Sequence, residues 1–294
     1  MIITITCNPA IDKTNINDKT YVEVGGKGIN VSKALHTLNE NSLALGFVGE
    51  NDKDLFEDNL NKYNIDYDFI FFDGKTRVNT KTIKDNHLIE DNEIGKEIDD
   101  SKLQKLKNKL NNYRNEIIVI SGSAPVNVRK TYYYELIEIC KKNNCFVILD
   151  SSKELLKNGI DAIPNVIKPN KDEFCELYNI EYSKENIINK AKELINLGIQ
   201  MVIVSLGKDG ALFICKDYVY DVNPIDVNYV SSLCSGDSMV AAVAFGIKNN
   251  LVIEEIIKLS IALASASVEE VGVATNIDKV NDYIKKVSIY KNRL

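Results

Sequence analysis

The chain has 294 residues, of which 45% are apolar and 27% are charged, a balance typical of a globular protein with a large core. Its 42 acidic residues outnumber its 36 basic residues, and the net charge of −6 gives no general attraction to nucleic acids or to anionic membranes. The two histidines, His36 and His87, disfavour a zinc site and a serine–histidine hydrolase. Carboxylates, lysines and backbone groups would have to carry any chemistry.

The cysteines indicate a reduced, cytoplasmic protein. They form no C-x-x-C pair, and most lie in apolar runs, where a thiol behaves as a small hydrophobe. The N-terminal run has no basic region or cleavage site, so we expect no signal peptide. No apolar stretch reaches membrane-spanning length. The six cysteines are Cys7, Cys140, Cys145, Cys175, Cys215 and Cys234.

Strands and helices are predicted to alternate along most of the chain. Apolar and β-branched runs predict strands at residues 2–6, 43–48, 117–120, 146–149, 166–167 and 201–205. Helical spacing predicts helices at residues 29–38, 52–62, 101–112, 127–143, 153–157, 171–178 and 184–197. Extended segments are expected around a turn in residues 67–83 and at 211–215 and 218–222, followed by helices at 236–249, 253–270 and 278–287. This alternation predicts a parallel sheet buried on both faces.

The strongest motif is formed by residues 234–238 (CSGDS), directly before an apolar helical run. Small residues at a helix start leave backbone N–H groups free to face an anion, and the helix dipole favours negative charge there. Asp237 in that first turn could take a proton from a hydroxyl while the N–H groups stabilise a transferring phosphoryl group. The alternative is structural, since Ser235 or Asp237 could simply cap the helix.

A second motif, residues 25–30 (GGKGIN), precedes another predicted helix. Glycines let the backbone approach a ligand closely, but the spacing fits neither the dinucleotide fingerprint nor the P-loop. Lys27 could bind a phosphate, and Asn30 could bind a hydroxyl from the first helical turn. The alternative is a glycine turn with a helix cap.

Three further motifs follow predicted strands. Residues 168–173 (KPNKDE) place an asparagine and a glutamate where they could share a Mg²⁺-bound water or form a capping box. Residues 205–210 (SLGKDG) could line a ligand site or form a tight turn, and residues 121–125 (SGSAP) also end a strand. Because the carboxyl ends of parallel strands meet at one edge, the motifs predict a single phosphate-handling crevice.

The chain carries, in order, TCNPAID, GGKGIN, SGSAP, KPNKDE, SLGKDG and CSGDSMVAA. This set resembles the PfkB branch of the ribokinase-like carbohydrate kinases, and the resemblance runs essentially from end to end. GGKGIN and residues 76–79 (TRVN) are similar to motifs of the 1-phosphofructokinase and tagatose-6-phosphate kinase subgroups. The resemblance implies a single three-layer α/β domain over residues 1–294, with a mostly parallel central sheet, flanking helices and a small β lid.

The resemblance also implies roles for individual residues. Asp237 would be the catalytic base, with the Ser235 and Gly236 backbone as the anion hole. Lys27 and Arg77 would hold the substrate's own phosphate. Residues implied to bind the sugar phosphate are Asp12, Gly26, Lys27, Asn30, Arg77 and Ser123. Residues implied to bind ATP and, for the glutamate, to order Mg²⁺ through water are Lys168, Asn170, Glu173, Ser205, Gly207 and Gly210.

Three departures from the family pattern stand out. Cys234 occupies a position where the family usually has glycine, and a left-handed turn there would strain a cysteine. Only residues 13–24 separate Asp12 from Gly25, so we expect a shortened lid built from about 13–24 and 67–90. The SGSAP motif also lacks the family's second proline and the glycine that follows it, which could alter the sugar pocket.

The expected function is transfer of the ATP γ-phosphoryl group to fructose 1-phosphate, giving fructose 1,6-bisphosphate. Tagatose 6-phosphate and fructose 6-phosphate are alternative acceptors, and a weakly catalytic sugar-phosphate-binding protein is an alternative of another class. Lys27 and Arg77 disfavour a nucleoside or vitamin kinase, because two cations suit a substrate that already carries phosphate. The expected partners are a small phosphosugar and a second copy of the chain in a homodimer, with no nucleic acid and no membrane.

Overall fold

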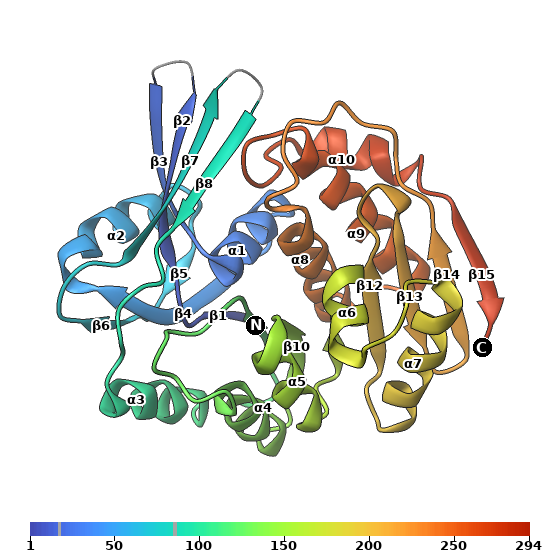
Figure 1. Ribbon diagram of the computed structural model, residues 1–294, viewed down its shortest axis with the longest axis horizontal. Coiled ribbons are helices and arrows are strands. Elements are labelled where there is room, and N and C mark those ends of the chain that lie inside the picture. Colours follow the sequence, from blue (N-terminus) through green and yellow to red (C-terminus); the bar gives the residue numbers. More distant parts are fainter. Residues whose placement is uncertain (17–18, 85–86) are drawn as a thin grey trace.

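The computed structural model describes residues 1–16, 19–84 and 87–294, and it combines one large sheet, flanking helices and a smaller second sheet (Figure 1). Within these ranges the large sheet has eleven strands in the order β15-β14-β13-β12-β11-β10-β9-β1-β4-β5, with β6 also paired to β4. Its strands are β1 (Ile2–Thr6), β4 (Ser42–Gly49), β5 (Asp66–Tyr67), β6 (Ile70–Phe72), β9 (Ile117–Ser121), β10 (Phe146–Asp150), β11 (Val166–Ile167), β12 (Met201–Ser205), β13 (Ala211–Cys215), β14 (Tyr218–Val222) and β15 (Ile289–Arg293).

The strands from β4 to β12 pair in parallel, and β13, β14 and β15 continue the sheet antiparallel. The mostly parallel sheet expected from the sequence is therefore confirmed. Two strands of the large sheet were not predicted from the sequence. β15 is mostly exposed and polar, and β5, with two residues, is too short to give a pattern. Both form by pairing with a neighbouring strand.

Helices cover both faces of the large sheet because successive residues of each strand point to opposite sides. In β9, Ile118 and Ile120 join one buried cluster, whereas Ile117 and Val119 join the other. The helices of the first cluster are α3 (Asp100–Leu110), α4 (Tyr132–Lys142), α5 (Lys153–Asp161), α6 (Lys171–Tyr178) and α7 (Lys184–Asn196). Those of the second are α1 (Lys27–Thr37), α8 (Ser235–Lys248), α9 (Ile253–Val268) and α10 (Ile277–Ile284). The expected three-layer α/β arrangement is confirmed.

A four-stranded sheet projects from the large one (Figure 1) and contains the segments predicted to form the lid, the name used for it below. Its strands, in spatial order, are β3 (Lys19–Gly25), β2 (Ala10–Ile16), β7 (Arg77–Lys84) and β8 (His87–Asn92). Helix α2 (Lys53–Asn61) packs near its base through a third buried cluster. Residues 17–18 and 85–86 of the predicted lid segments lie outside the described residues. That the lid is shorter than is usual in the family stays a prediction.

The lid is joined to the body at β3. The buried Lys33 of α1 donates to Glu23 at 2.6 Å and to the Val24 carbonyl at 2.9 Å. Asn59 of α2 accepts from the Val24 N–H at 3.4 Å. These bonds hold the end of β3 against α1 and α2. Among the described residues, no helix is both long and apolar enough to cross a bilayer.

Candidate active site

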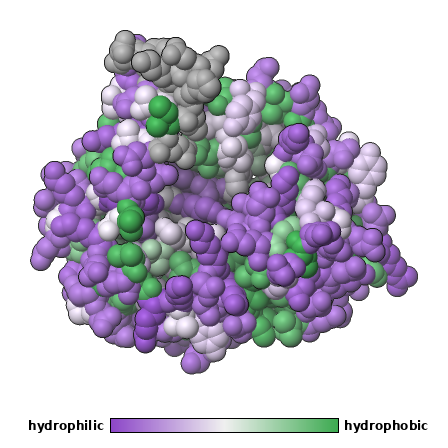
Figure 2. Space-filling model, in the orientation of Figure 1, coloured by the Kyte–Doolittle hydropathy of each residue, from purple (hydrophilic) through white to green (hydrophobic). Residues whose placement is uncertain are grey.

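A cavity of about 240 Å³ opens at the carboxyl ends of β1, β9 and β10. The chain order reverses here, because β1 lies between β4 on one side and β9 on the other, and such switch points are where α/β sheets bind ligands. Hydrophilic residues predominate on the face of the molecule drawn in Figure 2, including around the hollow below the lid. Four residues predicted from the sequence line this one cavity: Lys27, Arg77, Ser123 and Glu173.

Asp237 lies in the first turn of α8 and is buried, with only 3% of its surface exposed. Its carboxylate does not cap the helix; it accepts a hydrogen bond from the Asn30 amide of α1 at 2.8 Å. The Ser235 hydroxyl donates to the Ser232 carbonyl at 2.9 Å, and no side chain caps α8. The simple capping alternative is therefore wrong for both residues.

Cys234 is the residue before α8, and its φ of −107° is ordinary for any L-residue. The expected strain would have required a positive φ, so cysteine fits this turn without cost. The side chain packs into the second apolar cluster, where burial raises the pKa of the thiol to about 12. Cys234 thus acts as a small apolar residue that supports the start of α8.

The buried position of Asp237 makes it a stronger base than an ordinary aspartate. Burial is the largest influence and raises the pKa of Asp237 to about 7. Asp150 adds to the rise, whereas Lys27, the Asn30 hydrogen bond and Lys168 oppose it. A carboxyl with a pKa near neutrality is suited to accept a proton at physiological pH.

Two lysines share one buried carboxylate beside this base. Lys27 Nζ lies 3.2 and 3.3 Å from the two carboxylate oxygens of Asp150, and Lys168 Nζ lies 3.3 Å from Oδ1. Burial opposes the charge of Asp150, but Lys168 and Lys27 outweigh it and lower the pKa of that carboxyl. Burial also opposes the charge of Lys27, but Asp150, Asp237 and Glu173 hold its pKa above the ordinary value. Asp150 and Lys27 are therefore both charged at neutral pH.

The glycines before α1 make room for the side chains around the cavity. Gly26 has a φ of 111°, and a Cβ there would lie 2.7 Å from the Thr6 methyl group. At Gly25 a Cβ would lie 1.9 Å from Asp12 Oδ2. Only glycine at both positions lets α1 start beside β1 with the Asp12 carboxylate in place. Asp12 also accepts from the Asn79 amide of the lid at 2.9 Å, so β2 and β7 present these two polar groups together.

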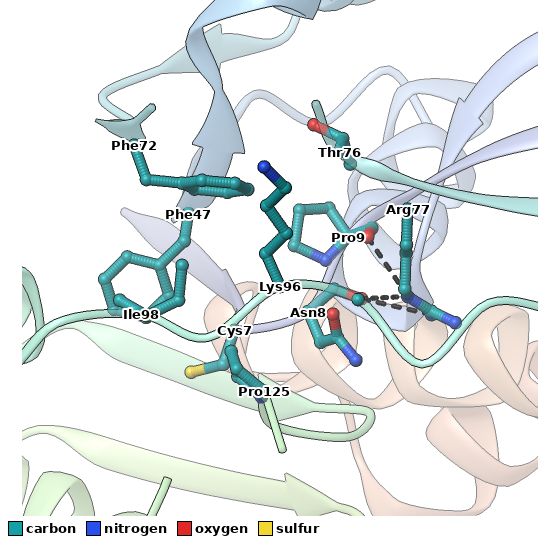
Figure 3. Close-up of a pocket in the computed structure, with 11 residues that line it drawn as sticks. Cys7, Asn8, Pro9, Phe47, Phe72, Thr76, Arg77, Lys96, Ile98 and Pro125 are labelled. Carbon is teal, nitrogen blue, oxygen red and sulfur yellow. Dashed lines mark hydrogen bonds between the residues drawn. The ribbon is translucent and has the colours of Figure 1, made fainter. Parts of the chain in front are cut away.

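Arg77 extends from the base of the lid and lines the cavity, but its guanidinium is largely occupied by the protein. It donates to the carbonyls of Asn8, Pro9 and Glu93 at 3.1–3.2 Å and to the Asn79 side chain at 2.9 Å. Figure 3 shows the bonds to Asn8 and Pro9 that hold the group in place. Burial lowers the pKa of Arg77, although arginine stays charged in proteins. It is a rigid cation at the cavity wall.

On the opposite side, Asn170 and Glu173 form a capping box at the start of α6. The Glu173 N–H donates to Asn170 Oδ1 at 2.8 Å, and the Asn170 N–H donates to Glu173 Oε2 at 2.9 Å. The structural alternative is thus correct as a description of local geometry. Because Glu173 also lines the cavity, capping does not remove it from the site. The contact of both residues with ATP and Mg²⁺ stays a prediction.

Residues 205–210 form the tight turn that was the alternative for this motif. Gly207 and Gly210 have φ values of 63° and 91°, and the Leu206 N–H donates to the Gly210 carbonyl at 2.8 Å. A Cβ on Gly210 would lie 1.9 Å from the Val222 carbonyl oxygen, whereas Gly207 has open space around it. Ser205 forms a parallel bridge with Asn170, which brings the two ATP-side motifs together. Gly210 is thus explained by backbone geometry, and its contact with ATP stays a prediction.

The family model described as pfkB family carbohydrate kinase matches residues 1–280. The chain belongs to this family. A 1-phosphofructokinase of Borreliella burgdorferi is 33% identical over 281 residues, which cover 91% of each chain. A tagatose-6-phosphate kinase of Staphylococcus epidermidis is 30% identical, with 98% of this chain and 99% of the relative covered. A crystal structure titled as a putative phosphofructokinase from Staphylococcus aureus superposes with a TM-score of 0.89 at 33% identity, covering 100% and 99% of the two chains.

Two polar residues of this carbohydrate kinase were missed as site residues. Asp150 was not singled out because it ends an apolar strand run, although an acidic residue at the carboxyl end of a buried parallel strand is itself a signal. Asn79 was noticed only as part of a subgroup motif. Asn79 lies two residues after Arg77 on the same strand, so both side chains are on the same face. This two-residue spacing could have identified Asn79 as a site residue from the sequence.

The pKa of Asp237 predicts how the activity of this kinase depends on pH. As a base it must be deprotonated, so kcat/KM for the sugar substrate should rise tenfold per pH unit below about 7 and level off above it. Initial rates between pH 5.5 and 9 would measure this rise, which is the acid limb of the pH profile of kcat/KM. In Asp237→Asn only the substrate phosphate, which titrates near pH 6, should still contribute. If the acid limb of kcat/KM were the same in the wild type and in Asp237→Asn, the assignment of Asp237 as the base would be wrong.

Proposed function

We propose that the protein transfers the γ-phosphoryl group of ATP to the 6-hydroxyl of fructose 1-phosphate, giving fructose 1,6-bisphosphate. The observation that carries the proposal is the position of two cations, Lys27 and Arg77, on the wall of one cavity next to a buried carboxylate base. Two fixed cations suit a substrate that already carries a phosphate group. The 1-phosphofructokinase relative at 33% identity supports the choice of sugar.

The reaction requires a base, an anion hole and a clamp for the nucleotide phosphates. Asp237 is the base and takes the proton of the attacking hydroxyl. The backbone N–H groups of Ser235 and Gly236, at the N-terminus of α8, stabilise charge on the phosphoryl oxygens. Lys168 supports this part of the site, because its ammonium lies 3.2 Å from the point that a Cβ on Gly236 would occupy. Lys168 is therefore assigned to the ATP phosphate next to the anion hole.

The remaining substrate contacts follow the predicted assignment. Asp12 and Asn30 bind sugar hydroxyls, with Gly26 against the sugar and Ser123 beside its phosphate. Asn30 contacts the base directly, because its amide donates to Asp237, and Asp12 stands on the first lid strand, β2. On the nucleotide side, the residues proposed to bind ATP are Lys168, Asn170, Ser205, Gly207 and Gly210.

Mg²⁺ is proposed to arrive with ATP. This cation usually keeps several waters and binds substrate phosphates with one or two carboxylates. Glu173 fits that chemistry, because its carboxylate lines the cavity and only one of its oxygens accepts a hydrogen bond from Asn170. When bound, the ion neutralises charge on the nucleotide phosphates. Glu173 is therefore assigned to ordering Mg²⁺ through water.

A coupled assay of ADP release tests the choice of sugar. With fructose 1-phosphate, tagatose 6-phosphate and fructose 6-phosphate at equal concentrations, we expect kcat/KM to be highest for fructose 1-phosphate by at least about tenfold, the value of one good polar contact. The tagatose 6-phosphate arm is included because a relative of that name is 30% identical. A higher kcat/KM for either 6-phosphate would replace the proposed substrate. Tight binding of all three sugars without ADP release would favour the binding-protein alternative.

A homodimer and a cytoplasmic location are the two other expectations that stay predictions. The lid offers a surface for the dimer, because Tyr21 and Val22 of β3 and Ile89 of β8 are exposed apolar residues. Exposed apolar groups on an edge strand favour pairing with another chain. For the location, the cysteines described here are all free thiols, as expected in a reducing compartment.

A further inference from the structure

The carboxylate of Asp150 has no role in the reaction as proposed so far, although it is fully buried at the centre of the site. It stands at the last position of β10, where the neighbouring strand β9 ends and the cavity begins. A buried carboxylate is costly unless it is paired, and here it is paired twice, with Lys27 and with Lys168.

The two lysines differ in exposure, which separates their tasks. The Lys27 side chain is 39% exposed and reaches into the cavity, whereas the Lys168 side chain is 4% exposed and lies under Gly236. Each ammonium has three N–H donors, so pairing with Asp150 leaves donors for phosphate oxygens. Asp150 therefore holds one ammonium group on the sugar side and one on the anion-hole side, and both keep N–H donors for phosphate oxygens.

The same two lysines also face the base. Their charges act on Asp237, yet in the part of the chain that the structure describes neither forms an ion pair with it, and both pair with Asp150 instead. An ammonium in direct contact with Asp237 would stabilise its charged form and weaken it as a base. The position of Asp150 thus decides which carboxylate the lysines contact.

We propose that Asp150 is a positioning residue that holds the ammonium groups of Lys27 and Lys168 on its own carboxylate and so keeps them from pairing with Asp237. The inference rests on the proposed function, in which Asp237 is the base. It assigns Asp150 an effect on the strength of the base rather than on the affinity for substrate. In Asp150→Asn the lysines would lose their partner and turn to Asp237.

The charged groups that act on Asp237 come from several elements. Lys27 belongs to α1, Asp150 to β10, and Lys168 follows β11. The thiol of Cys234, which precedes α8, is neutral at physiological pH and adds no charge. Removing the Asp150 charge takes away an influence that raises the pKa of Asp237 and frees two that lower it. Both changes have the same sign, so the base should become weaker.

The test is the pH dependence of Asp150→Asn, measured with both substrates. We expect the acid limb of kcat/KM to move to lower pH by about one unit and the plateau of kcat to fall by about tenfold or more, with no rise in KM for ATP. Asp150→Glu keeps the charge and should keep the limb at its wild-type position. Asp221→Asn is the matched control, because Asp221 also pairs with a lysine, Lys184 at 2.7 Å, on the remote strand β14. In Asp221→Asn the acid limb of kcat/KM and the plateau of kcat should both stay at their wild-type values.

A loss of kcat with an unmoved limb would show that Asp150 is merely structural and would overturn the inference, as would wild-type kinetics in Asp150→Asn. If Asp150→Asn does not fold, the double variant Asp150→Asn, Lys27→Met removes one unpaired cation as well. In that variant the pKa of Asp237 should be lower than in Lys27→Met alone, because Asp150 no longer raises it and Lys168 is freed to contact Asp237. An equal or higher pKa than in Lys27→Met would contradict the inference.

A readout without turnover separates this inference from the proposed function. The carboxyl ¹³C signal of Asp237, assigned by its loss in Asp237→Asn, reports its titration directly in wild type and in the variants. If the wild type transfers phosphate to none of the three sugars, the proposed function fails. The inference about Asp150 then stands or falls on whether the Asp237 pKa is lower in Asp150→Asn than in wild type.

Discussion

Replacing Asp237 by asparagine is expected to lower kcat by about 10³-fold, within the usual range for losing a general base. The change keeps the size of the side chain, and its oxygen can still accept the hydrogen bond from Asn30. What it removes is the ability to take the proton of the attacking hydroxyl. Affinity for ATP should be unchanged or slightly higher, because a negative charge near the nucleotide phosphates is lost. Steady-state kinetics and calorimetry with ATP measure the two effects separately.

The control for this variant is the same change at Asp278, which lies in the first turn of α10. Asp278 thus also occupies a helix start, so the comparison separates chemistry from helix stability. Asp278→Asn should keep wild-type kcat. An Asp237→Asn enzyme within about tenfold of wild type would remove Asp237 from the role of base.

Replacing Lys27 by methionine should lower kcat/KM for fructose 1-phosphate by about 10²–10³-fold. The side chain keeps most of its length but loses an ammonium that we assign to the substrate phosphate. A hydrogen bond to a charged group contributes about 1.5–3 kcal/mol, and two such bonds near the lower end of that range, about 3–4 kcal/mol together, give the expected factor. KM for the sugar phosphate should rise more than KM for ATP, because Lys168 remains on the nucleotide side. Kinetics with each substrate varied in turn measure the difference.

The matched control is Lys13→Met. Lys13 is exposed on the lid strand β2 and follows Asp12, so its side chain points to the opposite face of that strand. Removing its charge should leave both KM values unchanged. Equal losses of kcat/KM in Lys13→Met and Lys27→Met would indicate a general effect of net charge, and the phosphate assignment of Lys27 would be wrong.

The central sheet could be predicted from the sequence because its strands are continuous apolar runs. Ile2–Thr6 and Met201–Ser205 are nearly all buried, and their bounds match the prediction. The lid strands carry no such signal: β3 is exposed over its first five residues and is held by pairing with β2. Pairing of that kind depends on the tertiary structure, which local sequence patterns do not contain.

The site could be predicted only in part, for a related reason. Glycine-rich and serine-rich strand ends give a local signal, so Lys27, Ser123 and Glu173 were expected together and lie around one cavity. The pairing of Asp150 with two lysines from different elements has no local signal. The fit of Cys234 could not be foreseen either, because it depends on a φ of −107° that no pattern specifies.

The most direct test of the proposed reaction is the ³¹P NMR spectrum of the product formed from ATP and fructose 1-phosphate. The account predicts two phosphomonoester signals of equal intensity from one sugar, appearing in step with ADP, because the 6-hydroxyl receives the phosphoryl group while the 1-phosphate is retained. Inorganic phosphate and ADP with the sugar unchanged, or no reaction at all, would contradict it.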